Sequence, residues 1–295
     1  MRKYFIIIPI LILVYFLSGK DNSSIKTENK RIETDNLIVN MSNYGLENIL
    51  LSEYLNGVIA CEMPALFHDE AIKAGIVAAR TFYLYKYESD NDYKPSNGDQ
   101  CFFSESKRKE NWRDNYELYN EKILNNINLT KNEVITYNGS VIKAFYFSMS
   151  NGYTEDAVNV FKKSEPYLVS VISDYDKNVK NNLSSKSISV NEFKEKLNVD
   201  NDIVINNIVR DSSNRVSEIV INNVNYDGVY FRKLFDLRST DFEIEFNDQE
   251  VIITTRGYGH GVGMSQWGAN EMAKMGYEYR DILKYYYKDV EIMYK

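Results

Sequence analysis

The segment Arg256–Ala269 (RGYGHGVGMSQWGA) constrains the folding of this chain more than any other stretch, because five of its fourteen residues are glycine. Glycine adopts positive φ angles at little cost and lets another chain segment or a ligand approach the backbone closely. His260 lies between two of these glycines, so neighbouring Cβ atoms shield its ring little. The segment predicts either an exposed binding loop or a Gly-rich turn that caps a helix, with His260 packed in the core.

The residues toward the end of this segment favour sugar binding. Ser265, Gln266 and Trp267 supply hydroxyl, amide and aromatic groups in a row. A sugar ring needs hydrogen-bond partners for its OH groups and an apolar surface for its CH groups, and this combination supplies both. We therefore predict that His260, Ser265, Gln266 and Trp267 bind substrate. A nucleophilic Ser265–His260 pair is an alternative, although no elbow motif or acidic partner accompanies it.

Composition excludes several classes of protein. The chain has 35 Lys+Arg against 42 Asp+Glu, a net charge of −7, whereas a nucleic-acid binder relies on Lys and Arg to hold phosphate. Two Cys and two His residues are too few for a Cys-rich zinc domain or a disulfide scaffold. Hydrophobic residues make up 44% of the chain, which is enough to bury a core. We predict a folded protein without a nucleic-acid partner.

The N-terminus begins with an apolar run. Arg2 and Lys3 precede Tyr4–Leu17, which is shorter than the about 20 residues that a membrane span usually needs. The small residues that mark a signal-peptide cleavage site are poorly matched in Phe16–Gly19. We expect residues 1–19 to form an uncleaved, single-pass anchor in the cell membrane, with the rest of the chain outside the cytoplasm. A cleaved signal peptide is the alternative.

Residues 20–36 are polar, with few apolar side chains to bury, and we expect them to form a linker. Residues 37–295 are then predicted to form a single mixed α+β domain with a strand-rich second half. Apolar spacing predicts helices at Leu51–Cys61, Asp69–Tyr87 (with Asp69 as N-cap and a small-residue face), Asn191–Leu197, Gly263–Met275 and Tyr279–Tyr287. Residue preferences predict strands at residues 140–150, 202–209, 216–222, 242–245 and 251–255.

Four segments, found in this order, carry a family resemblance. They are LSEYLNGVIACEMPALFHDEAIKAGIVAARTFYLYK, IKAFYFSMSNGYTEDAVNVF, FDLRSTDFEI and GYGHGVGMSQWGANEMAKMGYEYRDILKYYYKDVEI. Together they resemble the stage II sporulation protein D family over residues 37–295. The resemblance implies a membrane-anchored lytic transglycosylase, which cleaves the MurNAc–GlcNAc bond of peptide-stripped peptidoglycan strands while the mother cell engulfs the forespore.

The resemblance also implies partners and a location. The partners are peptidoglycan glycan strands, a membrane-bound peptidoglycan amidase and a polytopic membrane scaffold of the engulfment machinery. The location is the mother-cell membrane, with the C-terminal domain facing the intermembrane space. The competing interpretation is a non-catalytic wall-binding protein that stimulates an amidase.

The resemblance assigns the catalytic acid to the Glu of the family's E-M-P-A segment, which is Glu62 here. Apolar neighbours of Glu62 favour its protonated form, which a proton donor needs. Ordinary glycosidases add a second carboxylate. A lytic transglycosylase can manage with one, because the ionised Glu can take a proton from the C6 hydroxyl of MurNAc, which then closes a 1,6-anhydro ring. The alternative from the residues alone is an exposed Glu at a helix end.

Three further residues are candidates for substrate binding. The resemblance implies that Arg80 lies near the active groove, where it would orient Glu62 or bind the lactyl carboxylate of MurNAc. The alternative for Arg80 is a buried ion pair with a structural carboxylate. Gln100 and Ser150 are polar groups within or beside family-like segments, and ordinary internal hydrogen bonds are their alternative.

The chain also departs from the family pattern. Many members carry a His about where Phe147 stands, and some clostridial-type relatives have a Cys/His pair, downstream of the catalytic segment, that can hold zinc. Here that region has only Cys101, with no His nearby. Three roles stay open for Cys101: a lone metal ligand, a partner for Cys61, or an inert thiol. We expect no zinc site built by the protein and no cofactor.

Overall fold

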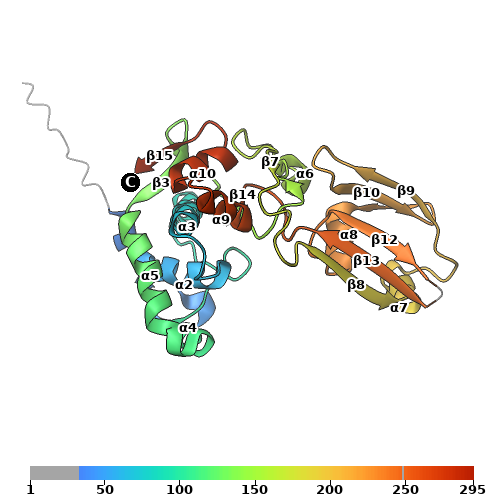
Figure 1. The fold of residues 1–295 in the computed structure, drawn as a ribbon, viewed down its shortest axis with the longest axis horizontal. Coiled ribbons are helices and arrows are strands. Elements are labelled where there is room, and N and C mark those ends of the chain that lie inside the picture. Colours follow the sequence, from blue (N-terminus) through green and yellow to red (C-terminus); the bar gives the residue numbers. More distant parts are fainter. Residues whose placement is uncertain (1–32, 248) are drawn as a thin grey trace, which may run out of the picture. The chain divides into compact units, whose positions relative to one another are not determined.

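The computed structural model describes residues 33–247 and 249–295 (Figure 1). The expected anchor and most of the expected linker lie outside the described residues. Within these two ranges, no helix combines the length and the apolar character that a membrane crossing requires. The described part is a single compact unit of helices and strands, which agrees with the predicted mixed α+β class.

Labels follow Figure 1. The α-helices are α2 (Leu51–Glu62), α3 (Asp69–Ser89), α4 (Glu105–Trp112), α5 (Tyr116–Leu129), α6 (Ala157–Phe161), α7 (Val190–Leu197), α8 (Gly228–Leu234), α9 (Gln266–Lys274) and α10 (Tyr279–Tyr286). The short 3-10 helices are η1 (Thr34–Asn36), η2 (Ser42–Tyr44) and η3 (Arg113–Asn115). The strands are β1 (Ile38–Val39), β2 (Ile49–Leu50), β3 (Glu133–Tyr137), β4 (Ser140–Val141), β5 (Tyr146–Phe147), β6 (Gly152–Tyr153), β7 (Ile172–Ser173), β8 (Leu183–Ser189), β9 (Ile205–Arg210), β10 (Val216–Ile221), β11 (Val224–Asp227), β12 (Phe242–Phe246), β13 (Glu250–Arg256), β14 (Met264–Ser265) and β15 (Glu291–Tyr294).

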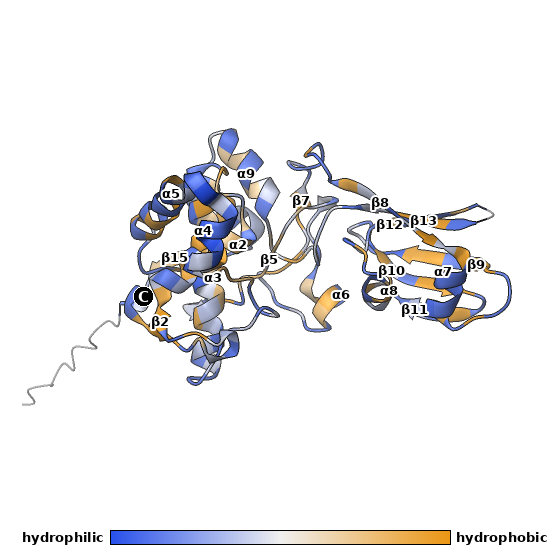
Figure 2. Ribbon diagram, turned by 90° about the horizontal axis from the view of Figure 1, so that it is seen from below, coloured by the Kyte–Doolittle hydropathy of each residue, from blue (hydrophilic) through white to orange (hydrophobic). Residues whose placement is uncertain are grey.

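The first hydrophobic cluster is built around α3, which contacts α2, α5, α9, α10 and β3 (Figure 1). Most side chains of α3 between Ala71 and Leu84 are buried. Gly75 shows how closely its neighbours pack, because a Cβ atom there would lie 2.3 Å from the sulfur atom of Met63. The predicted small-residue face of this helix is therefore confirmed. The outer helix α4 is mostly hydrophilic (Figure 2).

Two predictions about elements near the first hydrophobic cluster, the N-cap of α3 and the strand at residues 140–150, are corrected. The N-cap of α3 is His68, whose Nδ1 accepts a hydrogen bond from the Glu70 N–H at 3.3 Å, rather than Asp69. Residues 140–150 do not form one strand. The chain bends between β4 and β5, where the Ala144 N–H donates to the Ile142 carbonyl, so that β4 pairs with β3 while β5 pairs with β14.

The second hydrophobic cluster lies in the strand-rich part of the chain between β8 and β13. Two antiparallel three-stranded sheets, with orders β11-β10-β9 and β12-β13-β8, carry helices α7 and α8 (Figures 1 and 2). Alternate side chains of β10 and β13 point into this cluster, as the period of a strand dictates. The four strands predicted between residues 202 and 255 and the short helix before them are confirmed, with small shifts of their ends.

The Gly-rich segment packs against the chain around residue 150. Tyr258 forms an isolated bridge with Met149, and Val262 forms one with Glu155. Gly257 and Gly263 have φ angles of +81° and +79°, and a Cβ atom at these positions would lie 2.8 and 2.0 Å from main-chain oxygen atoms. The glycines therefore allow close approach of another chain segment, which places the start of α9.

Candidate active site

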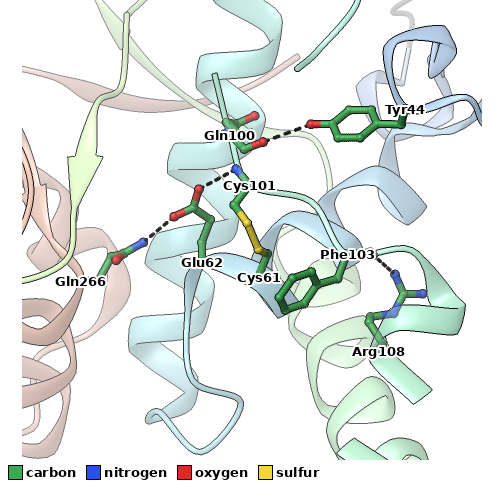
Figure 3. The surroundings of a disulfide bond; sticks show 8 residues. All are labelled: Tyr44, Cys61, Glu62, Gln100, Cys101, Phe103, Arg108 and Gln266. Carbon is green, nitrogen blue, oxygen red and sulfur yellow. Dashed lines mark hydrogen bonds between the residues drawn. A yellow bond between two sulfur atoms is a disulfide. The ribbon is translucent and has the colours of Figure 1, made fainter. Parts of the chain in front are cut away.

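Glu62 is the last residue of α2, where the chain leaves the helix. Met63 is extended, with φ −129° and ψ +139°, because the following Pro64 disfavours the helical conformation there. The Cys101 N–H donates to Oε1 of Glu62 at 2.8 Å, and Nε2 of Gln266 donates to Oε2 at 3.4 Å (Figure 3). Three distant chain segments thus meet at one carboxyl group.

Burial controls the electrostatics of this group. It raises the pKa of Glu62 above its usual value of 4.5, and the hydrogen bonds from Cys101 and Gln266 oppose the rise. Both hydrogen-bond partners of Glu62 are neutral N–H donors, so neither adds a second negative charge beside it. Glu62 therefore holds its proton to higher pH than an exposed Glu, while two donors remain in place to stabilise its charged form once the proton has left.

Cys101 and Cys61 form a disulfide bond, with their Cα atoms 5.6 Å apart (Figure 3). Of the three roles left open for Cys101, pairing with Cys61 is the one observed. The bond joins the residue before Glu62 to the residue whose N–H binds Glu62. Within residues 33–247 and 249–295, no group of three or more His, Cys, Asp or Glu side chains is arranged to hold a metal ion.

Gln100 is buried, with 2% of its surface exposed, and its side chain is fully used inside the protein. Its Oε1 accepts from the Tyr54 hydroxyl at 3.2 Å, and its Nε2 donates to the Tyr146 hydroxyl at 3.0 Å and to the Ala79 carbonyl at 3.3 Å. The prediction that Gln100 binds substrate is corrected, because these bonds leave its amide turned inward. Gln100 instead anchors the segment that carries Cys101.

Arg80 is fully buried and does not contact Glu62. Its Nε and Nη2 donate to both carboxylate oxygens of Asp35, at 2.6 and 3.1 Å, and its Nη1 donates to the Glu133 carbonyl. The substrate-binding role predicted for Arg80 is corrected in favour of the buried ion pair. The same pair shows that the fold begins earlier than predicted, since Asp35 and the buried Thr34 had been placed in the linker.

Ser150 and Ser265 share a buried carboxylate. The Ser150 hydroxyl donates to Oδ1 of Asp176 at 2.6 Å and the Ser265 hydroxyl to Oδ2 at 2.7 Å, and none of the three side chains is exposed. Ser265 also caps α9 by accepting from the Gly268 N–H at 3.1 Å. Both serines were predicted to bind substrate, and both are corrected to interior positions. Their network fixes the start of α9, and hence Gln266.

His260 is packed against aromatic side chains instead of being presented to a ligand. Its Nδ1 accepts from the Val262 N–H at 3.0 Å. Burial, with smaller contributions from Arg232 and Arg215, lowers the pKa of His260 to about 3, so the ring is neutral at physiological pH. The ring lies against three phenylalanines, Phe145, Phe147 and Phe161. His260 is thus a half-buried residue packed among aromatic rings, which is nearer to its packing alternative, and the Ser265–His260 nucleophilic pair is not formed.

Gln266 lies next to the candidate acid, and Trp267 follows it at the start of α9. Gln266 is 5% exposed and contacts Glu62, and Trp267 is half-buried beside it. The Trp267 ring meets the ring of Phe67 edge-on, with centroids 4.7 Å apart. The geometry therefore brings together Glu62 and Gln266 from the predicted site, while Trp267 packs on Phe67. That the last two bind sugar stays a prediction.

Two features of the site were not predicted. One is the main-chain N–H of Cys101, which no side-chain pattern reveals, although a cysteine directly before Glu62 was an available signal. The other is Tyr146 on β5, whose hydroxyl accepts from Gln100 and whose pKa is raised first by burial and then by the charge of Glu62. Tyr146 lies within the segment IKAFYFSMS that carried the resemblance.

Comparisons with known proteins identify relatives of this chain. A family model described as Stage II sporulation protein matches residues 42–137, which include Glu62 and both cysteines. The chain is 40% identical to stage II sporulation protein D of Bacillus amyloliquefaciens over 262 residues, covering 85% of this chain and 76% of the relative. It is 35% identical to stage II sporulation protein D of Bacillus subtilis (strain 168) over 314 residues, covering 97% and 92%.

A third relative has a different name. The amidase enhancer of Bacillus subtilis (strain 168) is 29% identical over 290 residues, covering 79% of this chain and 39% of that protein. The two sporulation proteins match over most of their own lengths, and their matches extend well beyond residues 42–137. On this evidence the chain belongs to the stage II sporulation protein D family and is a sporulation protein.

Proposed function

We propose that this protein is a peptidoglycan lytic transglycosylase with Glu62 as its single catalytic carboxyl group. The observation that supports this best is the environment of Glu62. Burial raises its pKa, and the two groups that contact it are hydrogen-bond donors from Cys101 and Gln266. A carboxyl group whose acid form is favoured by burial, and whose charged form is stabilised by two donors, suits a catalyst that must act first as an acid and then as a base.

The reaction proceeds in two steps. Protonated Glu62 donates its proton to the glycosidic oxygen, the bond between that oxygen and C1 of MurNAc breaks, and GlcNAc leaves with a free hydroxyl. Glu62, now a carboxylate held by the Cys101 N–H and Gln266, takes the proton of the MurNAc C6 hydroxyl. The C6 oxygen attacks C1 and closes the 1,6-anhydro ring, which returns Glu62 to its protonated state without a second carboxylate.

Substrate recognition is proposed to rest on neutral groups. Gln266 contacts Glu62, the half-buried Trp267 follows Gln266 in the chain, and the net charge of the chain is −7. Cell wall is itself anionic, so overall charge does not attract this protein to its substrate. We therefore assign delivery to a membrane anchor at residues 1–19, with the folded part outside the cytoplasm in the space between mother cell and forespore.

The proposed partners follow from the family resemblance. We propose that this protein works beside a membrane-bound peptidoglycan amidase, which removes the stem peptides, and a polytopic scaffold. One relative is named an amidase enhancer. That name favours a second candidate function, in which this protein binds glycan, stimulates the amidase and uses Glu62 only as a ligand contact.

Product analysis separates these two functions. The purified protein is incubated with peptidoglycan that an amidase has stripped of stem peptides, and the soluble products are identified by mass spectrometry. The transglycosylase predicts 1,6-anhydro-MurNAc ends that disappear in Glu62→Gln, an isosteric change that removes the titrating group. Glu47→Gln is the matched control, because Glu47 is exposed and precedes the same helix. Glycan binding without anhydro products in the unaltered protein would establish the second function.

A further inference from the structure

We propose that the Cys61–Cys101 disulfide holds the Cys101 N–H on Glu62, so that Glu62 works at its full rate only while this bond is intact. This inference rests on the proposed function for its effect on the reaction. The disulfide is then a positioning device for the catalytic acid, and the two cysteines act through Glu62 without touching the substrate.

The covalent bond and the hydrogen bond join the same two chain segments at adjacent residues. Cys61 directly precedes Glu62 at the end of α2, and Cys101 is both the second half of the disulfide and the donor to Oε1 of Glu62 (Figure 3). Rotation or displacement of the main chain at Cys101 is therefore opposed by the link to Cys61. Without that link, the peptide unit that carries this N–H is held by the hydrogen bond from the Tyr44 hydroxyl to the Gln100 carbonyl, at 3.2 Å, and by the residues on either side of it (Figure 3).

Those neighbouring residues are well anchored without the disulfide. The Phe103 N–H donates to the Gly57 carbonyl at 3.0 Å, and the Phe103 carbonyl accepts from Arg108 at 3.1 Å. On the other side, Gln100 is buried and bonded to Tyr54. We therefore expect the segment to stay folded when the disulfide is removed, with the loss of order confined to Cys101.

The hydrogen bond from the Cys101 N–H stabilises the charged form of Glu62, so losing it changes the pKa of Glu62 in a known direction. It lowers the pKa of Glu62 against the effect of burial. Weakening it raises the pKa further, and the acid form then persists to higher pH. The titratable groups that sense the Glu62 charge are Tyr44 and Tyr146, and the pKa of both is raised, that of Tyr44 to about 12, so both stay neutral across the relevant range.

The test compares the intact protein, the protein reduced with a phosphine, and the double variant Cys61→Ala/Cys101→Ala. Reduction breaks the S–S bond and leaves two thiols, while the phosphine becomes its oxide with oxygen from water. Two quantities are measured as a function of pH: the rate of anhydro-product release and the ¹³C chemical shift of the Glu62 carboxyl, assigned with Glu62→Gln. The phosphine added to the double variant controls for effects that do not involve the disulfide.

We expect both disulfide-free forms to remain folded by circular dichroism and to titrate Glu62 at higher pH than the intact protein. Their maximal rate should fall about tenfold, the scale of one lost hydrogen bond to a charged group. Reoxidation should restore the reduced protein and leave the double variant unchanged. An unchanged titration of Glu62 in both forms would overturn the proposal. If no form releases anhydro products, the transglycosylase function fails, and the carboxyl titration still decides whether the disulfide positions Glu62.

Discussion

Glu62 and His260 are both partly buried titratable residues, and their surroundings give them opposite behaviour. The Glu62 carboxyl meets two donors from other chain segments and can exist in both protonation states. His260 accepts one main-chain hydrogen bond and lies among aromatic rings. Burial and the positive charges of two arginines favour its neutral form and outweigh an opposing hydrogen bond to the main chain of Tyr146. The hydrogen-bond donors around Glu62 make it a candidate catalyst, whereas the surroundings of His260 make it a packing residue.

The neutral state of His260 predicts a pH dependence of stability. Its pKa is about 3 in the folded protein against an ordinary value of 6.5, so the unfolded chain binds a proton that the folded protein does not. The resulting contribution is complete above pH 6.5 and is lost as the pH falls toward 3, by about 1.4 kcal/mol for each pH unit. Urea unfolding of the native protein and His260→Gln between pH 7 and pH 4 measures this, and equal slopes would contradict it.

Arg80 provides a second prediction for a single residue. Arg80→Met leaves the buried carboxylate of Asp35 without its cation, and loss of one partner of a buried pair costs about 3–5 kcal/mol. Asp35→Leu added to Arg80→Met should recover part of this loss, because no unpaired charge then remains. Denaturant unfolding gives the stability of both variants. A variant that keeps native stability but loses glycan binding would return Arg80 to the substrate site.

At the scale of elements, the site depends on how α9 begins. Ser265 caps this helix and binds Asp176, β14 pairs with β5, and Gln266 follows directly. Local sequence predicted a helix here, starting at Gly263. It did not predict that the first residues of that segment form a strand pair and a cap, because the pairing partner lies more than a hundred residues away.

A substitution at Gly263 tests whether the pairing of β14 with β5 positions Gln266. Gly263→Ala places a Cβ atom about 2 Å from the Phe145 carbonyl oxygen, so β14 must move away from β5 and carry Gln266 with it. Gly139→Ala is the matched control, with a φ angle of +77° and no atom within 4 Å of the added Cβ. Both variants share the cost of a positive φ angle. Only Gly263→Ala should also lose most anhydro-product release, and equal rates in the two folded variants would refute the argument.

At the scale of the whole molecule, the described chain leaves one hydrophobic cluster, builds a second between β8 and β13, and returns to the first. Glu62, Cys101 and Gln266 all belong to segments that pack on the first cluster. The second cluster is formed largely by Phe193, Phe231, Phe235 and Phe242, whose rings contact one another. The proposed catalytic carboxyl group and the groups that bind it therefore belong to the part of the fold that holds the first cluster, and none of them belongs to the second.

The variant Phe193→Ala tests whether the second cluster affects stability without affecting the reaction at Glu62. Phe193 is fully buried and stacks on Phe235, so its truncation should reduce the free energy of unfolding by about 3–5 kcal/mol. The pH dependence of product release by the folded variant should match that of the native protein, because Phe193 packs in the cluster away from Glu62. Calorimetry and initial rates check the two halves of this prediction, and a shifted pH profile would show that the clusters are coupled.

Although it did not predict α4, α5 and α8, the sequence by itself determined the family, the mixed α+β class, helices α2, α3, α7 and α10, four strands of the second cluster, and Glu62 at the end of a helix. These follow from local signals: the spacing of apolar residues, the preferences of β-branched residues, and a proline two positions after Glu62. Only the tertiary structure decided what surrounds each polar group. Arg80, Gln100, Ser150 and Ser265 proved to be buried residues and His260 a half-buried one, whereas the Glu62 carboxyl is bound by groups 39 and 204 residues away in the chain. Burial and hydrogen-bond partners arise from contacts between distant segments, and these contacts set the pKa of a side chain and its access to a ligand.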